Sequence, residues 1–237
     1  DLAMGGEMPM PTGGSRDFMD MYPRPYMDLM YNVPLWGYQL SNLYHFNWDS
    51  FKDEFGEYDA TAALKAHRTA MATSLVHGME FFQGIEYKHY LMAKFMMLKK
   101  LPGQFEFIPS WQANGLFKIA NNDPEVDVAV YKKDDVLLVI LCNYAKSQKN
   151  TDVWLDFPKL IRPPANLEWR AVLDFETLEF PGWLALEEGI VKHYRCGDFS
   201  RGHNTMFQPN TLRVPVEPRD FRALLFINVP VAKGAGF

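Results

Sequence analysis

The pattern of hydrophobic and polar positions changes near Leu101-Pro102-Gly103. Before this point, hydrophobic residues recur at helical spacing, and short apolar segments separate the helical stretches. From Gln104 onward, hydrophobic and polar residues alternate with a period of two, which is typical of half-buried β-strands. The sequence therefore predicts an α/β part followed by an all-β part, with the boundary at residues 103 and 104.

The first part contains one helix with clear signals at both ends. Asp59 is a suitable N-cap, because its carboxylate can accept hydrogen bonds from the free N–H groups of the first turn. The helix is expected from Ala60 to Val76, and Gly78 is a suitable C-terminal stop. Three residues at helical spacing are expected on its buried face: Leu64, Met71 and Leu75.

Short apolar segments lie on both sides of this helix. Residues 33–40 are predicted as a strand and the loop after it, and residues 79–83 as a strand. Residues 43–48 are predicted as strand or loop, and residues 85–100 as a second helix. This alternation is typical of a parallel sheet with crossover helices. A closed barrel of this kind needs eight such units. If the segment belongs to a barrel, the other units are expected outside this chain.

The second part reads as a series of short strands. Lys132–Asp135 has the composition of a hairpin turn between two of them. Strands at this spacing predict an antiparallel β-sandwich. The candidate strands are residues 104–108, 115–120, 126–132, 136–143, 151–157, 167–174, 189–193, 212–216 and 221–229.

Composition and charge exclude several classes of function. The 237 residues are 48% hydrophobic and 22% charged, so the chain can bury a core. The net charge of −5 and the lack of a basic patch argue against nucleic acid as a partner. The longest apolar run, residues 136–142, is too short to span a membrane.

The sequence shows no spacing typical of a metal or cofactor site, so no cofactor is expected. The six histidines are scattered, and each is interpreted as a polar or packing residue rather than a metal ligand. Cys142 and Cys196 could pair, but two distant cysteines do not form a disulfide framework. Buried free thiols are therefore the preferred interpretation.

Several segments resemble one class of carbohydrate-processing enzyme. Asp59–Gly84 resembles the last helix and strand of the catalytic barrel in α-galactosidase-like glycoside hydrolases and related uncharacterised families. Phe107–Trp111 resembles the entry to their C-terminal sandwich, and residues 126–131, 137–143 and 221–228 resemble its strands. The resemblance implies that residues 1–103 form the C-terminal part of a (β/α)8 barrel with an irregular N-terminal segment. Residues 104–237 would then form the β-sandwich.

The resemblance also indicates where to look for a site. Barrel sites lie at the C-terminal ends of the strands, and glycoside hydrolysis needs two carboxyl groups. The candidate residues are Glu80 and Asp49 as catalytic carboxyls, and Trp36, Trp48, His45 and Gln83 for substrate binding. The competing interpretations are structural: Glu80 could pair with Arg68 or Lys88, Asp49 could cap a turn, and the tryptophans could pack in a core.

Two functions remain open at this point. In the first, the chain is the C-terminal portion of a glycoside hydrolase whose main catalytic carboxylates lie in a missing N-terminal half or a neighbouring protein chain. In the second, it is a non-catalytic extracellular module that binds glycan or takes part in a structural assembly. Both imply a carbohydrate or protein partner and an extracellular or secretory location.

Overall fold

The chain was analysed as a computed structural model, which describes residues 6–9, 18–31, 41–45, 51–52, 55–78, 80–83, 105–162, 168–178 and 211–230. The predicted helix at 85–100, the strands at 33–40 and 189–193, and Cys196 lie outside the described residues. Among the described residues, no helix has the length and apolar character required to cross a membrane.

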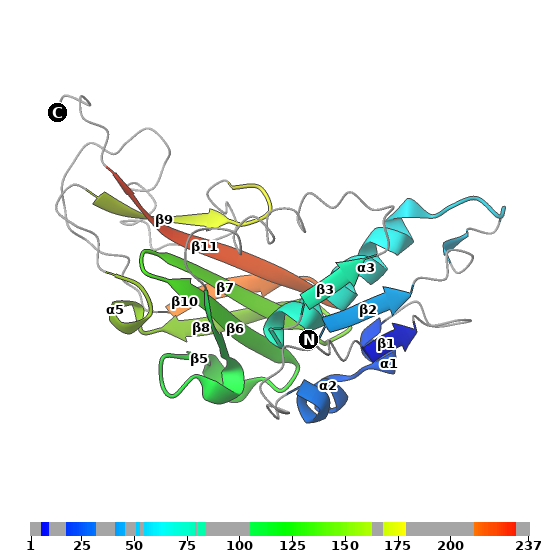
Figure 1. Cartoon of the computed structure of the whole chain (residues 1–237), viewed down its shortest axis with the longest axis horizontal. Coiled ribbons are helices and arrows are strands. Elements are labelled where there is room, and N and C mark those ends of the chain that lie inside the picture. Colours follow the sequence, from blue (N-terminus) through cyan, green and yellow to red (C-terminus); the bar gives the residue numbers. More distant parts are fainter. Residues whose placement is uncertain are drawn as a thin grey trace.

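The first part contains a three-stranded parallel sheet in the order β1-β2-β3. Helices lie between the consecutive strands along the chain (Figure 1). The sheet has the β/α alternation expected from the sequence, and β2 falls partly in the segment predicted as strand or loop. However, β1, α1 and α2 lie in the N-terminal segment that was expected to be irregular. The elements are β1 (Gly6–Pro9), α1 (Phe18–Met21), α2 (Arg24–Tyr31), β2 (Ser41–His45), α3 (Ala60–Val76) and β3 (Glu80–Gln83).

The predicted ends of α3 are confirmed. The Asp59 side chain accepts a hydrogen bond from the backbone N–H of Ala62 at 2.9 Å, and Gly78 follows the helix with a φ of 68°. The predicted buried face is only partly correct, because Leu64 is 42% exposed. Residues 69–77 are buried without interruption, whereas in the first turn Ala60 and Thr61 are exposed and Ala63 is buried.

The second part is an antiparallel β-sandwich, as the sequence predicts. One sheet has the strand order β10-β8-β5 and the other the order β4-β6-β7-β11-β9. Asp134 and Asp135 form the predicted hairpin between β6 and β7. The strands are β4 (Glu106–Pro109), β5 (Phe117–Ile119), β6 (Val126–Lys133), β7 (Val136–Asn143), β8 (Lys149–Leu155), β9 (Glu168–Asp174), β10 (Thr211–Val216) and β11 (Asp220–Pro230).

The predicted strand at 151–157 ends two residues early. Phe157 instead begins the short helix α5 (Phe157–Leu160), which has a proline in its first turn. Proline at this position costs no hydrogen bond, because the first N–H groups of a helix have no partner within it. Phe157 stays in the core, where its ring packs edge-on against Phe226 of β11 at 5.1 Å between centroids.

The five-stranded sheet is buried on both faces. One face packs on the sheet β10-β8-β5 and forms the first hydrophobic core. The other face packs on α3 (Figure 1) and forms a second core, which includes Met71 and Val76 of α3, Ile140, Phe221 and Met19 of α1. This double burial explains why residues 136–142 form an uninterrupted apolar run instead of an alternating one.

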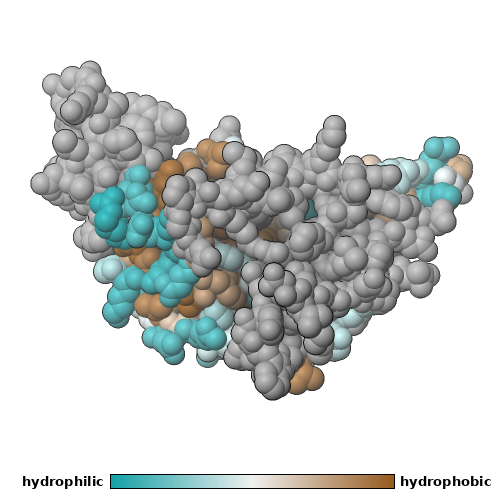
Figure 2. Space-filling model, viewed as in Figure 1, coloured by the Kyte–Doolittle hydropathy of each residue, from teal (hydrophilic) through white to brown (hydrophobic). Residues whose placement is uncertain are grey.

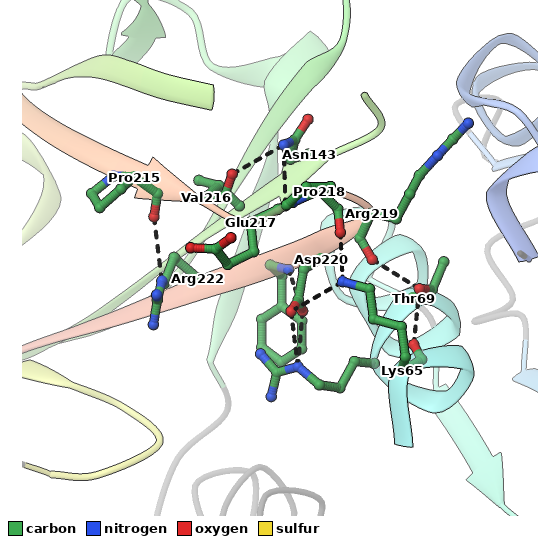
Figure 3. A network of polar contacts seen from close by, with 12 residues as sticks. Lys65, Thr69, Asn143, Pro215, Val216, Glu217, Pro218, Arg219, Asp220 and Arg222 are labelled. Carbon is green, nitrogen blue, oxygen red and sulfur yellow. Dashed lines mark hydrogen bonds and ion pairs between the residues drawn. The ribbon is translucent and has the colours of Figure 1, made fainter. Parts of the chain in front are cut away.

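A polar network fastens α3 to the chain that crosses from β10 to β11 (Figure 3). Lys65 donates to the carbonyl of Pro218, and the Thr69 hydroxyl donates to the carbonyl of Arg219. The buried side-chain amide of Asn143 donates to the carbonyls of Val216 and Glu217, at 3.0 and 3.1 Å. These bonds provide donors for the backbone carbonyls of the segment that connects β10 to β11. They therefore fix the position of this segment.

Tyr131 of β6 links the sandwich to the C-terminal end of α3. Its hydroxyl donates to the carbonyl of Leu75 at 2.6 Å, and burial raises the pKa of this phenol. The Leu75 carbonyl lies in the last turn of α3, where it also accepts a longer bond, 3.4 Å, from the backbone N–H of Gly78. The neutral phenol is therefore the form that the folded protein favours.

We expect Tyr131→Phe to lower the free energy of unfolding at pH 7 by about 1–2 kcal/mol, because the Leu75 carbonyl loses the shorter of its hydrogen bonds. The raised pKa of the Tyr131 phenol stabilises the folded state below the unfolded pKa of about 10 and ceases to do so as the pH rises further. The variant should therefore lose less stability than the wild-type protein above about pH 10. Urea unfolding across this pH range measures both effects, with Tyr58→Phe at an exposed position as the control. Parallel curves for Tyr131→Phe and the wild-type protein would contradict the assignment.

Candidate functional site

Three of the candidate residues from the sequence lie in the parallel sheet. His45 ends β2, and Gln83 ends β3 opposite Tyr44. These two residues therefore lie at the same C-terminal edge of the sheet, on neighbouring strands. Glu80 begins β3 opposite Ser41, at the other edge of the sheet.

This register separates the two candidates of β3. In a barrel, the C-terminal edge carries the chemistry, and that edge holds Gln83 and His45 rather than Glu80. Trp36, Trp48 and Asp49 lie outside the described residues. Their predicted roles, like those of the three residues in the sheet, stay predictions.

Arg68 was one suggested structural partner of Glu80, and it has two other carboxylate partners. Its guanidinium donates to both oxygens of Glu176 at 2.8 and 2.9 Å, and its Nε donates to Asp220 at 2.9 Å. These bonds join α3 to the end of β9 and the start of β11. The Arg68 side chain therefore serves the contact between the two parts of the molecule.

A second polar region is an open cavity of about 460 Å³, formed where α2 lies against β5 and β6. We call it the α2 cavity. It carries charges of both signs together with polar groups. The residues that give it this character are Arg24, Asp28, Lys118, Asn122, Asp123 and Asp127.

Asp127 of β6 lies at the inner wall of the α2 cavity and is fully buried. Its Oδ1 accepts from the backbone N–H of Val128 at 2.8 Å and lies 3.5 Å from Nη2 of Arg24. Its Oδ2 has no hydrogen-bond partner among the described residues. A buried carboxylate oxygen without a partner is costly, so this atom marks the site as unusual.

Arg24 of α2 ties this helix to the sandwich. Its Nη1 donates to the carbonyls of Pro124 and Val126 at 2.8 and 2.9 Å. Its Nε lies 3.5 Å from Oδ2 of Asp28, one turn further along α2. Arg24 therefore positions Asp28 and offsets part of the negative charge that Asp28 and Asp127 bring to the cavity.

His77 meets these carboxylates from the end of α3. Its Nδ1 lies 2.8 Å from the carbonyl of Thr73, and its Nε2 lies 3.2 Å from Oδ1 of Asp28. The imidazole packs beside Trp111 with 5.7 Å between ring centroids. We call Asp28, His77 and Asp127 the Asp–His cluster. Their ligand-type atoms all lie within 4.8 Å of one another.

The negative charge of Asp127 affects the pKa values of two nearby side chains, Cys142 and Tyr144. Burial raises the pKa of the Cys142 thiol, and the negative charge of Asp127 raises it further. Burial also raises the pKa of Tyr144, with added contributions from Cys142 and Asp127. Both groups are therefore neutral. Cys142 is the buried free thiol that the sequence analysis expected.

Sequence reasoning did not find the Asp–His cluster. Its members come from α2, from the end of α3 and from β6, and no short spacing connects them. The one local signal is Asp127 itself, a charged residue inside the otherwise apolar segment Val126–Val130. A carboxylate at such a position is rarely buried without a partner of opposite charge.

Comparisons with known proteins identify no family for this chain. No protein-family model and no curated protein matches it. A solved GH30 endoxylanase from Clostridium papyrosolvens C71 is 11% identical with a TM-score of 0.35, covering 94% of this chain and 48% of that one. A glycoside hydrolase family 30 subfamily 8 xylanase from Clostridium acetobutylicum is 10% identical with a TM-score of 0.33, covering 93% and 56%. The chain thus spans about half the length of these two proteins.

Proposed function

We propose that this chain is the C-terminal portion of a carbohydrate-active protein, with glycosidic-bond hydrolysis as the activity of the complete protein. The supporting observation is the order of its parts. Three parallel strands follow one another in sequence order with helices between them, and an antiparallel sandwich follows later in the chain. Sequential parallel strands are the arrangement of a (β/α)8 barrel, in which five further strands complete the ring.

In this proposal the five other strands come from a preceding part of the same protein or from a neighbouring chain. That part would also carry the main catalytic carboxylates. The C-terminal edge of β2 and β3 would then face the sugar, with His45 and Gln83 as polar contacts. Trp36 and Trp48 would stack on sugar rings, whose C–H faces are apolar.

The two candidate carboxyl groups, those of Asp49 and Glu80, would lie at opposite edges of the sheet. Asp49 follows β2 in the sequence, so it would lie on the loop at the edge that binds sugar. Glu80 begins its strand, so it would act only from the opposite edge of the sheet. A role for the protein outside the cell or in the secretory pathway belongs to the same proposal.

The packing of α3 supports a structural role for the sandwich. The buried side of α3 forms part of the second sandwich core, and Arg68 binds two sandwich carboxylates. The sandwich would therefore hold the last crossover helix of the barrel in position. This is a physical reason for the two parts to occur together in one chain.

Binding of polysaccharides by this chain tests the proposal directly. We expect affinity electrophoresis with xylan, cellulose and galactomannan to show retardation by at least one of them. His45→Ala and Gln83→Ala should each weaken that binding roughly tenfold, the effect expected when a buried polar contact of about 1.4 kcal/mol is lost. Arg213→Ala, at a 67% exposed position of β10, is the matched control and should bind normally.

Two results would change the conclusion. Binding that is lost in sandwich variants and retained in His45→Ala and Gln83→Ala would favour the non-catalytic glycan-binding module. Absence of retardation by every polysaccharide, together with no turnover of aryl glycosides by the complete protein, would overturn the carbohydrate proposal.

A further inference from the structure

The contact between His77 and Asp28 implies a cation between them. A carbonyl oxygen only accepts hydrogen bonds, so the Nδ1 of His77 that faces the Thr73 carbonyl carries a hydrogen. In the neutral imidazole, Nε2 then presents a lone pair. This lone pair would face an acceptor, Oδ1 of Asp28, at 3.2 Å. Two acceptors at this distance repel each other unless a proton or a metal ion lies between them.

The Oδ2 atom of Asp127 favours a metal ion over a proton as the cation between His77 and Asp28. A proton on Nε2 would serve the contact to Asp28 alone. The Oδ2 atom of Asp127 would still lie buried without a hydrogen-bond partner among the described residues. A metal ion satisfies the imidazole and both carboxylates at once, because their ligand atoms lie within 4.8 Å of one another. We propose that Asp28, His77 and Asp127 bind a divalent transition-metal ion.

The chemistry of the three ligands favours zinc or a similar ion. One imidazole and two carboxylates suit Zn²⁺, which takes nitrogen and oxygen ligands at about 2.0–2.2 Å. Two ligands of a tetrahedral ion at these distances lie roughly 3.3–3.5 Å apart, close to the 3.2 Å between Nε2 and Oδ1 of Asp28. The ligand atom of Asp127 lies within 4.8 Å of the ligand atoms of Asp28 and His77, so an ion bound by these two lies beside the Asp127 carboxylate.

The groups around the ligands have the form that metal sites use. The Thr73 carbonyl fixes the tautomer of His77 that leaves Nε2 available. A ligating histidine commonly donates its other ring N–H to a backbone carbonyl of this kind. Arg24 lies 3.5 Å from both Asp28 and Asp127, so the two carboxylates and the guanidinium sum to one negative charge. The remaining negative charge attracts a divalent ion, and Arg24 neutralises part of the repulsion between the two carboxylates.

The α2 cavity provides access and an open position. Asp28 and Asp127 both line it, so an ion held between them and His77 would face a space of about 460 Å³. Three protein ligands and a fourth position open to solvent are the features of zinc sites that bind water or a small oxygen ligand. The site therefore differs from a closed structural zinc site and can exchange its fourth ligand.

Titration of the metal-free chain with ZnCl₂ tests this site. Protein stripped with EDTA should bind one equivalent of Zn²⁺ by calorimetry. The melting temperature should rise by roughly 5–10 °C at about one hundred times the dissociation constant. Co²⁺ in place of Zn²⁺ should produce the visible absorption of a four-coordinate nitrogen and oxygen site, which reports on the ligands independently of stability.

Ligand variants locate the ion. Asp127→Asn and His77→Gln should each weaken Zn²⁺ binding by about 100-fold or more. The asparagine keeps a side-chain oxygen for the N–H of Val128, so this variant is expected to fold and to match the stability of the metal-free protein. His67→Gln is the control, because His67 is also buried in α3 and its Nδ1 contacts the carbonyl of Ala63. It should bind Zn²⁺ normally.

Two outcomes overturn the proposal. If Zn²⁺ binds the Asp127→Asn and His77→Gln variants with unchanged affinity, the ion lies elsewhere. If millimolar Zn²⁺ produces neither heat nor a shift in melting temperature, the cation between His77 and Asp28 is a proton. Neither outcome bears on the carbohydrate proposal, because polysaccharide binding at β2 and β3 is measured separately.

Discussion

Arg68→Met should lower the free energy of unfolding by about 3–5 kcal/mol, because it removes the guanidinium that pairs with two partly buried carboxylates, those of Glu176 and Asp220. Arg68, Asp220 and Glu176 have side chains that are 19%, 11% and 16% exposed. Burial opposes the charge of Arg68, but its hydrogen bonds to Glu176 and the charge of Asp220 outweigh burial and raise its pKa. The guanidinium also lies over the ring of Phe221 at 4.8 Å. The substitution therefore removes four hydrogen bonds and the contact with the Phe221 ring.

Lys65→Met is the matched control for Arg68→Met. Lys65 is also on α3 and also approaches Asp220, but its side chain is 44% exposed. Exposed ion pairs contribute about 0–1 kcal/mol, so this variant should change stability little. Arg68→Lys should fall between the two, because lysine keeps the charge and loses the paired geometry of the guanidinium. Denaturant unfolding measures all three variants. Equal losses for Arg68→Met and Lys65→Met would show that the network contributes no stability.

Gly78→Ala is the second large effect, with an expected loss of about 2–4 kcal/mol from backbone strain and steric overlap together. Gly78 has a φ of 68°, which a residue with a Cβ adopts only at a cost. A Cβ at this position would also lie 2.5 Å from Cε1 of Phe107. Phe107 cannot move away freely, because its ring packs on Tyr131 with 4.9 Å between centroids.

Gly115→Ala separates the two contributions to the effect of Gly78→Ala. Gly115 has a similar φ of 78°, but a Cβ there would meet nothing within 4 Å. Its loss should be about 1–2 kcal/mol, from the backbone alone. Truncating the ring in Gly78→Ala/Phe107→Ala should remove the steric part, so the two substitutions should not be additive. Thermal or urea unfolding provides the double-mutant cycle. If Gly78→Ala costs no more than Gly115→Ala, the overlap with Phe107 has no energetic consequence.

Local signals account for the parts of the fold that were predicted from the sequence. Asp59 and Gly78 mark the ends of α3 because capping depends on residues next to the helix. The strand at Val136–Asn143 was predicted to the residue, since its apolar run and the turn before it are contiguous in the chain. Where a prediction was wrong, as for Leu64, the burial of the residue depended on where α3 lies against the sheet.

The candidate site shows the same division. His45 and Gln83 were chosen as residues near strand ends, and the register places them at one edge of the parallel sheet. The sequence could not separate Glu80 from Gln83, because a four-residue strand has both ends within one short segment. The direction of β3 beside β2 decided which of the two lies at the C-terminal edge.

The sequence by itself determined the two classes of structure, the limits of α3 and most sandwich strands, because periodicity, caps and turns act over a few neighbouring residues. Only the tertiary structure decided that α3 covers the outer face of the five-stranded sheet and that Arg68 meets Asp220 and Glu176. It also decided that Asp28, His77 and Asp127 meet beside the α2 cavity. These residues are far apart in the chain, and the packing of α2 and α3 against β6 brings their charges together.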